Sequence, residues 1–543
     1  MTIDRELDLA DIQGNVLQDF VSGFPAARFL LLKVNDAFKG RQFVLEYRAK
    51  VTTALRWASS NAFVQKIQTT KPDVAINLGF TFSGFLMLGF PTRTLARLPA
   101  EFIDGMRKRA AILGDDKNLG DTGMEGQYVD GVAQWDPVWR RNDVAGAPEQ
   151  AHIIVGLNAG IQSDGAPIAA LDRETQHLQE LCAKYDLTIL AGHGRNNALW
   201  QDACALLAED NTPKLAQTKA TYRPVPREHF GFIDGISNPV FDGQYGDPHA
   251  DQMMSIGNGK LLAAAPGLSS LDRWAPLATG EVLLGYPDEA QEIAPMAAPN
   301  EIMRNGTFMV FRKLHENVGA FHAYFDKTAA IYAGANDVSV EEACMILKAK
   351  MAGRWEDGVP VAVAPTIAEW KAFNAKYAGT DNDWAYTNFT YADDPLGVKC
   401  PVASHMRRAN TRDGLNGKSS ALNNRRRILR RGQPYGKTTN DDADEHGIIF
   451  LLMCADLGRQ YEFVQQQWIN YGLDSNAGND TCPIVGNRQG DAKFIIPVDP
   501  GGAGTPFVAA GIPQFVETRG GDYFFLPSMT ALRMIGMGTI DPT

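Results

Sequence analysis

Short apolar runs bounded by turn residues are the feature that most constrains the fold of this chain. Six of them have the length and composition of strands: "RFLLLKV" (28–34), "HIIVGLNA" (152–159), "LTILAGH" (187–193), "GTFMVFRKL" (306–314), "GIIFLLMC" (447–454) and "DYFFLPSM" (522–529). Several are mostly apolar, which is typical of strands buried on both faces. The chain is therefore expected to contain buried β-sheet.

Helical patterns lie between these runs, at 339–355, 366–373 and 459–470. The first two open with a hydroxyl residue and a glutamate in capping-box spacing, which is typical of a helix N-terminus. Each half of the chain also carries an apolar strand followed by a longer helical stretch, with "AHIIVGLNAG" in the first half and "HGIIFLLMCADL" in the second. This loose repeat predicts two α+β units.

Length and composition exclude some classes of protein. A chain of 543 residues is too long for one ordinary domain, so two domains are expected. The formal net charge of −11 argues against general nucleic-acid binding. Six cysteines without a CxxC pair indicate reduced thiols and a cytoplasmic protein. We see no secretory signal and no apolar run of membrane-spanning length, so no membrane partner is expected.

The segment "PREHFGFIDGISNPVF" (226–241) places one acid, Asp234, between two glycines and among apolar side chains. Asp and Gly together are ordinary turn chemistry, and the motif alone favours a turn. The apolar neighbours favour a buried acid with a function instead, because burial disfavours an ionised carboxylate unless a cation or donors offset the cost. Acids tuned in this way are typical of active sites.

Two further segments carry candidate functional groups. In "CPVASHMRRANTRD" (400–413), His405 is either a surface histidine in a basic loop or a metal or haem ligand, since imidazole is a common ligand of both kinds. Between residues 407 and 431 the chain has eight arginines and one lysine against one acid. This concentration indicates an anionic partner such as haem propionates or nucleic acid, or a solvated basic face.

Taken together, the three segments resemble the dye-decolorizing peroxidases, a family of haem enzymes. "GFIDG" is similar to the GxxDG signature of that family, "HMRRANTR" to the segment with its iron ligand, and "RILRRGQPYG" to the segment with its distal arginine. "LADIQGNVL", "NGTFMVFRKL" and "GIIFLLMCADLGRQYEFVQQQW" extend the resemblance over most of the chain, whose length is similar to that of the longer subgroups. The family often has Arg where this chain has Ile233, so any ion pair made by that Arg is missing here.

The resemblance implies an α+β fold of two ferredoxin-like domains with antiparallel sheets, at residues 1–225 and 226–543. The second domain, with long insertions, would hold one haem b. His405 would bind the iron, Asp234 would move the protons of hydrogen peroxide, and Arg430 would stabilise the negative charge that develops. The implied activity is that of a peroxidase that oxidises aromatic, dye-like or phenolic substrates by one-electron steps.

Four other residues are expected near the haem. Arg408 and Arg412 are candidates for pairing with its propionates, and Ile236 for apolar contact with it. Glu462, in the helical stretch after the strand at 447–454, is a candidate anionic partner of His405, which would make the imidazole more electron-rich. Surface charge is the other interpretation of these arginines and this glutamate.

Two other functions stay open. A non-catalytic haem-binding or haem-handling protein on the same fold would use His405 but would need neither Asp234 nor Arg430, and the presence of both favours the enzyme. A nucleic-acid binder would use the arginine-rich segment 407–431, against the overall acidity of the chain. Neither the oligomeric state nor the physiological reducing substrate follows from the sequence.

Overall fold

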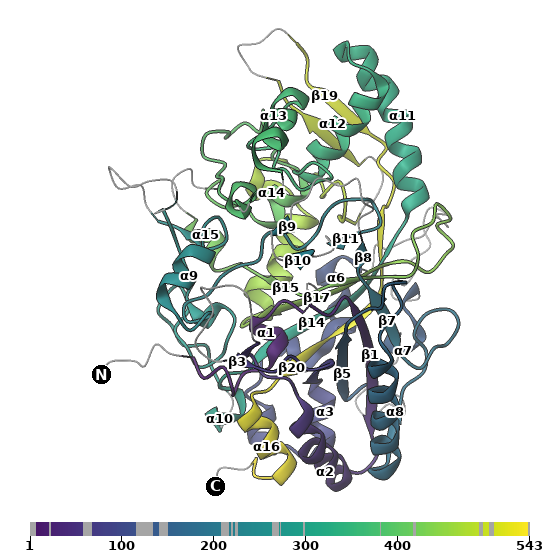
Figure 1. The fold of residues 1–543 in the computed structure, drawn as a ribbon, viewed down its shortest axis with the longest axis vertical. Coiled ribbons are helices and arrows are strands. Elements are labelled where there is room, and N and C mark those ends of the chain that lie inside the picture. The colour runs from purple at the N-terminus through teal and green to yellow at the C-terminus, as the bar shows by residue number, and fades with distance from the viewer. Residues whose placement is uncertain are drawn as a thin grey trace.

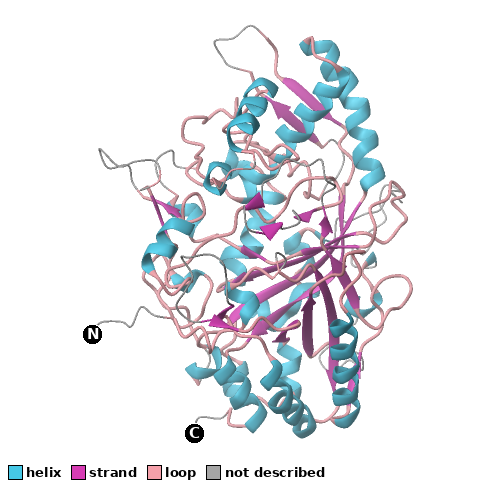
Figure 2. Cartoon of the chain, in the orientation of Figure 1, coloured by secondary structure: helices cyan, strands magenta, loops and turns pink. Residues whose placement is uncertain are grey.

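A sheet of ten strands crosses the molecule, and helices gather at both ends of the view (Figure 1; Figure 2). Its main path runs in the order β15-β17-β14-β20-β4-β5-β1-β6, with β16 and β7 pairing to β17 and β1, and every pairing is antiparallel. The structure, a computed structural model, describes residues 7–20, 23–57, 68–115, 134–140, 150–207, 217–218, 221–222, 226–262, 271, 273–296, 299–378, 380, 382–415, 420–487, 492–498 and 504–540.

The N-terminal half builds one ferredoxin-like unit. Its strands lie in the order β4-β5-β1-β6, and a helix follows the first and the third of them along the chain. The elements are β1 (Ala26–Val34), α2 (Ala37–Tyr47), β4 (Val74–Phe80), β5 (Ile153–Ala159), α8 (Ala169–Lys184) and β6 (Leu187–Ile189). β1 is buried along almost its whole length, as its mostly apolar sequence predicts.

The C-terminal half repeats this order with β15-β17-β14-β20. Its strands are β14 (Thr307–Glu316), β15 (Leu429–Arg430), β16 (Gln433–Tyr435), β17 (Gly447–Cys454) and β20 (Val516–Leu526). The two segments that resembled each other in the sequence are β5 and β17, which occupy the same place in their units. The prediction of two ferredoxin-like units with antiparallel sheets is confirmed, whereas the domain boundary between residues 225 and 226 stays a prediction.

The two units share one sheet and one core. β20 pairs with β4 through Phe525 and Phe80, which joins the two halves edge to edge. Aromatic rings cross the junction, with centroids 5.9 Å apart for Phe85 and Phe525 and 5.3 Å apart for Phe102 and Phe308. Side chains from both halves therefore belong to a single hydrophobic cluster.

Helices inserted into the C-terminal unit form the group at the upper end of Figure 1. They are α11 (Val318–Asn336), α12 (Val340–Ala352), α13 (Ile367–Tyr377) and α14 (His405–Ala409), together with a small two-stranded sheet of β18 (Lys493–Ile496) and β19 (Phe507–Ala510). Both predicted capping boxes are present, at the N-termini of α12 and α13. The predicted helix at 459–470 consists of two π-helical segments, η6 (Leu457–Glu462) and η7 (Val464–Ile469).

Shorter elements complete the chain. The helices are α1 (Gly14–Leu17), α3 (Phe82–Met87), α4 (Thr92–Leu95), α5 (Ala100–Lys108), α6 (Ala110–Leu113), α7 (Pro137–Arg140), α9 (Pro248–Met254), α10 (Asn300–Met303), α15 (Ala421–Asn424) and α16 (Met529–Met537). The strands are β2 (Arg56–Trp57), β3 (Gln68–Thr69), β7 (Gln201–Cys204), β8 (Leu206–Leu207), β9 (Gln217–Thr218), β10 (Thr221–Tyr222), β11 (Pro226–Arg227), β12 (Lys260–Leu261) and β13 (Trp274–Ala275). Within the described ranges, no helix combines the length and apolar character needed to cross a bilayer.

Candidate active site

A cavity of about 270 Å³ lies against the sheet of the C-terminal unit. Its walls come from the loop around Asp234, from β14, β15, β17 and β20, and from α14 and η7. Much of the lining is apolar, including Phe230, Phe232, Leu314, Met406, Ile448, Phe450, Val464, Ile469 and Val516. Apolar walls with a few polar groups are typical of sites for small molecules and cofactors.

The loop that carries Asp234 is held in a tight fold. Gly231 and Gly235 have φ of 101° and 80°, the left-handed region that glycine enters without strain. The carboxylate of Glu228 accepts hydrogen bonds from two backbone N–H groups further along the loop, at 2.8 and 2.6 Å. Glu228 thus closes the loop on itself, and Asp234 borders the cavity.

Asp234 and Arg430 form an ion pair at this cavity. Arg430 lies on β15, and its Nη1 is 2.7 Å from Oδ1 of Asp234. Burial by itself would raise the pKa of Asp234, but the charge of Arg430 and the hydrogen bonds from Arg430 and the Gly235 N–H outweigh it and lower that pKa below its usual value. The carboxyl group is therefore ionised at neutral pH.

His405 is the first residue of α14 and lines the same cavity. Its Nδ1 lies 3.3 Å from Sγ of Cys482, a residue for which the sequence offered no signal. Because that contact engages Nδ1, Nε2 is the nitrogen left for a ligand. Burial raises the pKa of the Cys482 thiol, but His405 and Arg408 outweigh this effect and lower it to about 6.

Glu462 is not the partner of His405, and that expectation is wrong. Arg109 holds its carboxylate with two donors, each at 2.5 Å, and the hydroxyl of Tyr523 donates to it at 2.8 Å. The π-helical turns of η6 direct Glu462 toward β20 instead of toward α14. Cys482 is the residue that contacts the imidazole of His405.

The expected propionate partners also lie elsewhere. Arg408 donates to two backbone carbonyls at 2.6 and 2.7 Å, and Arg412 donates to two others at 3.0 and 2.8 Å and stacks on the ring of Phe389. Neither borders the cavity. Ile236 packs against a separate apolar cluster around Trp355 instead of facing the cavity.

Two arginines that we did not predict as haem partners do line the cavity: Arg354 and Arg427. Each donates to two backbone carbonyls, and Nε and Nη2 of Arg354 have no partner among the described residues. Burial lowers the pKa of Arg354 to about 10 and that of Arg427 to about 9. Neither has a carboxylate partner within the described residues, so both are suited to receive the anionic groups of a ligand.

These features fit haem. His405 supplies an imidazole for iron, the apolar walls suit a flat macrocycle, and the two unpaired guanidinium groups suit its two carboxylates. Five of the eight arginines in the arginine-rich segment are buried, and of these five only Arg427 lines the cavity: Arg407, Arg408, Arg412, Arg427 and Arg431. They do not form an exposed basic surface for nucleic acid.

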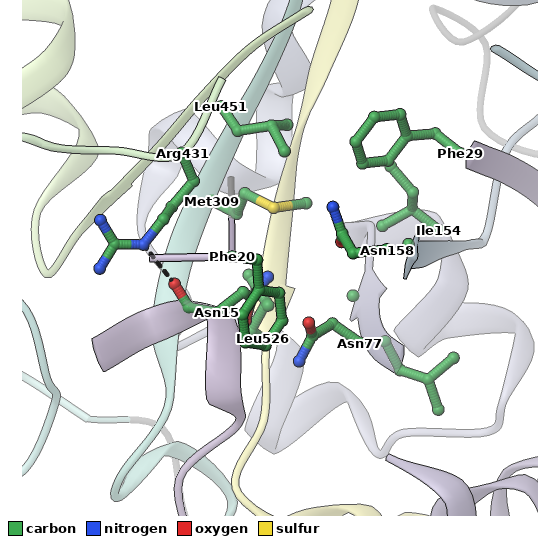
Figure 3. Close-up of a pocket in the computed structure, with 13 residues that line it drawn as sticks. Asn15, Phe20, Phe29, Asn77, Ile154, Asn158, Met309, Arg431, Leu451 and Leu526 are labelled. Atoms are coloured by element: carbon green, nitrogen blue, oxygen red, sulfur yellow. Dashed lines mark hydrogen bonds between the residues drawn. The ribbon is translucent and has the colours of Figure 1, made fainter. Parts of the chain in front are cut away.

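A second, much smaller cavity lies where the two units meet (Figure 3). Its volume is about 30 Å³, which is about the volume that one molecule occupies in liquid water. Asn77, Asn158 and Met309 face it, and Arg431 closes one side by donating from Nε to the carbonyl of Asn15 at 2.8 Å. This space is too small for a cofactor.

Comparison with known proteins gives relatives of one kind, although no family model matches the sequence. The chain is 30% identical over 325 residues to Multifunctional dye peroxidase DyP2 of Amycolatopsis sp., a match that covers 57% of this chain and 61% of that protein. It is 29% identical to Peroxidase 2 of Mycetinis scorodonius over 56% of each chain. The first three relatives are each matched over little more than half of their length.

One relative and the solved structures extend the match over nearly the whole chain. Dye-decolorizing peroxidase AauDyP1 of Auricularia auricula-judae is 27% identical over 97% of this chain and 86% of its own. A solved fungal DyP-type peroxidase from the same organism superposes with a TM-score of 0.68 at 22% identity, over 98% of this chain and 99% of that one. A dye-decolorizing peroxidase in complex with 2,6-dimethoxyphenol gives 0.67 at 24% identity, over 98% and 100%. In sequence and in fold, the chain is similar to the dye-decolorizing peroxidases.

Proposed function

We propose that this protein is a haem-dependent peroxidase that reduces hydrogen peroxide and oxidises aromatic substrates one electron at a time. The observation that carries the proposal is a single cavity that collects His405 and the Asp234–Arg430 ion pair from distant segments. An imidazole is the usual protein ligand of haem iron. An ionised carboxylate beside a fixed cation supplies a proton acceptor and a stabiliser of developing negative charge. The activities named for the relatives support the same function.

One haem b per chain is the proposed cofactor. When bound, haem supplies the iron at which peroxide is reduced, and the protein supplies binding, orientation and electrostatics. His405 would hold the iron through Nε2, while Cys482 would fix the ring from the other nitrogen. Arg354 and Arg427 would pair with the two carboxylates of the cofactor, in place of the residues that the sequence suggested.

Asp234 and Arg430 would act on the peroxide itself. Oδ of Asp234 takes the proton from one peroxide oxygen and returns it to the other, which leaves as water. The Nη groups of Arg430 stabilise the negative charge that grows as the O–O bond breaks. Because the two side chains are already paired at 2.7 Å, both groups are oriented before substrate arrives.

The reducing substrates are proposed by class. The solved relative that carries 2,6-dimethoxyphenol suggests phenols and related aromatic compounds for this chain. A non-catalytic haem-binding protein is the second candidate, but it would have no use for the preformed Asp234–Arg430 pair. The cytoplasmic location that we expect from the cysteine content stays a prediction.

Two measurements test the proposal. The purified protein, as isolated or after addition of haem, should show the Soret band of a histidine-ligated haem, and absence of that band would overturn the proposal. Asp234→Asn should keep the band and slow the reaction with peroxide by about 100-fold or more, because the proton acceptor is lost. Asp242→Asn, an exposed aspartate eight residues further along, is the matched control and should react at the wild-type rate. If Asp234→Asn reacted with peroxide at the wild-type rate, the second candidate function, a non-catalytic haem-binding protein, would be favoured instead.

A further inference from the structure

One buried ion pair at the cavity joins the two halves of the chain and has no part in the function proposed so far. Arg312 on β14 lines the cavity, and its Nη2 lies 2.5 Å from Oδ1 of Asp115, which does not line it. The two side chains are buried, with 4% and 0% of their surfaces exposed. The cation therefore belongs to the cavity wall, whereas its counter-charge lies behind that wall and comes from the N-terminal half.

The backbone before Asp115 explains how an N-terminal residue reaches this place. α6 ends at Leu113, and Gly114 caps it with φ of 79°, the left-handed conformation that commonly ends helices. Asn470 donates to the carbonyl of Leu113 at 2.8 Å. Asn487, which lines the cavity, donates to the carbonyl of Gly114 at 2.6 Å. The C-terminal unit thus holds the turn that presents Asp115 to Arg312.

The same ion pair orders two hydroxyl groups of the cavity wall. Nη1 of Arg312 donates to the hydroxyl of Tyr461 at 2.6 Å, and Nη2 donates to the hydroxyl of Thr518. Thr518 in turn donates to Oδ1 of Asp115 at 3.0 Å. Tyr461 and Thr518 both line the cavity. Charge-assisted hydrogen bonds on both of its Nη groups therefore fix the guanidinium group of Arg312 in one orientation.

The other arginines of the cavity show what this counter-charge does. Arg430 is paired with Asp234 inside the cavity. Arg354 and Arg427 have no carboxylate partner within the described residues and would receive the carboxylates of the cofactor. Among these four arginines, Arg312 is the one whose charge is cancelled by an acid outside the cavity. Without that acid, the wall would present a surplus cation to the cofactor.

Stability alone does not account for the pair. Desolvation of two buried charges offsets much of their attraction, and apolar side chains of similar size often stabilise a protein as well. Oδ2 of Asp115 has no hydrogen-bond partner among the described residues, which adds to the cost of burying this carboxylate. The pair does give the cavity a fixed local charge, and charges act strongly on one another inside a protein because the interior screens them weakly.

We propose that Asp115 is a positioning residue of the active site: through Arg312 it sets the charge beside the haem and thereby the reduction potential of the iron. The inference rests on the proposed peroxidase function. A positive charge near the iron favours the reduced state, because reduction adds an electron there. Asp115 cancels the charge of Arg312 and so keeps the potential lower. Reduction of peroxide withdraws electrons from the iron, and a lower potential favours that step.

Asp115→Asn tests this role, because asparagine keeps the size of the side chain and removes its charge. With Arg312 left uncompensated, the reduction potential measured by spectroelectrochemistry should rise. A double variant, Asp115→Asn with Arg312→Gln, removes both charges, and its potential should return to the wild-type value. Asp136→Asn is the matched control. Asp136 is another buried acid of the N-terminal half, 2.8 Å from Lys313 of β14, but Lys313 does not line the cavity, so the potential should stay at the wild-type value.

The haem-free protein gives a second readout. The denaturant midpoint of its unfolding should fall in Asp115→Asn, because a buried guanidinium group loses its partner, and should recover in the double variant. If Asp115→Asn alone fails to fold, a folded double variant with the wild-type potential supports the role of charge.

Three results would count against these proposals, and they differ from one another. The same potential in the wild type and in Asp115→Asn would overturn the role of Asp115 and leave the peroxidase intact. A double variant whose potential stays as high as that of Asp115→Asn, or failure of both variants to fold, would also overturn that role, because packing and not charge would then be decisive. Absence of haem from the wild type would instead overturn the proposed function, while the recovery of stability in the haem-free double variant would still be measured.

Discussion

At the scale of single residues, the site depends on charged groups held beside one another inside an apolar cavity. Asp234 stays ionised there because Arg430 lies 2.7 Å away. His405 is oriented by the sulfur of Cys482, at 3.3 Å from its Nδ1. Each contact joins residues far apart in the chain, so the properties of each group depend on a partner that the local sequence does not contain.

Arg430→Gln should raise the pH below which the reaction with peroxide slows, which we call its acid limit. Without that charge, burial dominates and the pKa of Asp234 rises, so its proton-accepting form is lost at a higher pH on acidification. The rate at neutral pH should also fall by roughly 100-fold, as for loss of a charge-stabilising donor. Stopped-flow rates across the acid and neutral range measure both effects. Arg425→Gln, which loses an ion pair with Asp288 away from the cavity, should leave the acid limit in place.

Arg354→Gln should weaken haem binding. A hydrogen bond to a charged group contributes about 1.5–3 kcal/mol, which corresponds to a loss of roughly 10- to 100-fold in affinity. Titration of the haem-free protein with haem gives the dissociation constants. Arg412→Gln, at the position that the sequence suggested, should bind haem as the wild type does once circular dichroism shows that it is folded. If Arg412→Gln weakened haem binding and Arg354→Gln did not, Arg412 would be the partner of a propionate.

Replacement of Cys482 should change the redox potential of the bound iron. A more anionic partner makes the imidazole of His405 a stronger donor and stabilises the ferric state. Cys482→Ala should therefore raise the potential, whereas Cys482→Asp, which keeps a negative charge beside the imidazole, should stay near the wild-type value, as measured by spectroelectrochemistry. Cys454→Ala, a buried cysteine on β17 away from His405, is the control. The same potential in all four proteins would show that Cys482 only fills space.

At the scale of elements, the position of His405 depends on how α12 ends. Gly353 caps α12 with φ of 91°, and its N–H donates to the carbonyl of Ala349 at 2.7 Å. A Cβ at this position would lie 3.1 Å from Cβ of Met406, the residue after His405. The end of one helix and the start of α14 therefore touch where only a glycine fits without strain.

Gly353→Ala should destabilise the protein by about 1–2 kcal/mol, the cost of a left-handed backbone with a Cβ. Because the added methyl presses on α14, the Soret spectrum should change as well. Gly334→Ala, on the open face of α11, should instead stabilise the protein by about 0.4–1 kcal/mol and leave the spectrum unchanged. Denaturant unfolding followed by circular dichroism and by haem absorbance checks both. An unchanged Soret spectrum in Gly353→Ala would show that the end of α12 does not determine the position of His405.

At the scale of the whole molecule, the two ferredoxin-like units behave as one body in the structure. They share a sheet through the pairing of Phe525 with Phe80 and a core that draws side chains from both halves. The Arg431 side chain, one residue from Arg430, also donates to the carbonyl of Asn15 at 2.8 Å. The cavity thus rests on contacts with the N-terminal unit.

The two units should therefore unfold together. Calorimetry of the haem-free protein should give one cooperative transition, because separating the units would expose the core that they share. A chain of residues 226–543 alone should not bind haem with wild-type affinity. Two well-separated transitions, or a fragment that binds haem as the full chain does, would show that the C-terminal unit folds independently.

Much of the fold and part of the site could be predicted from local chemistry. Mostly apolar runs predicted five of the longer strands, and capping boxes predicted the starts of α12 and α13. β4 ("VAINLGF") was missed, although like the predicted strand β5 it carries one asparagine and one glycine among apolar residues. Asn77 is nevertheless buried.

Within the site, motif residues were predicted and their partners were not. His405, Asp234 and Arg430 belong to recognisable segments, and the structure brings all three to one cavity. Arg354 and Arg427 were missed because nothing in their own segments shows which buried arginine lacks a carboxylate. Cys482 was missed because the residue beside an imidazole depends on how α14 and the chain after η7 pack together.

The order of apolar and polar residues along the chain determined its elements, their burial and the motifs that carry reactive side chains, because those depend on neighbours within a few positions. Only the tertiary structure decided which elements pair, which arginines face the cavity, and that Arg430 lies beside Asp234. The physical reason is that a charge inside a protein takes its energy from whatever lies within a few ångströms in space. Those neighbours come from any part of the chain.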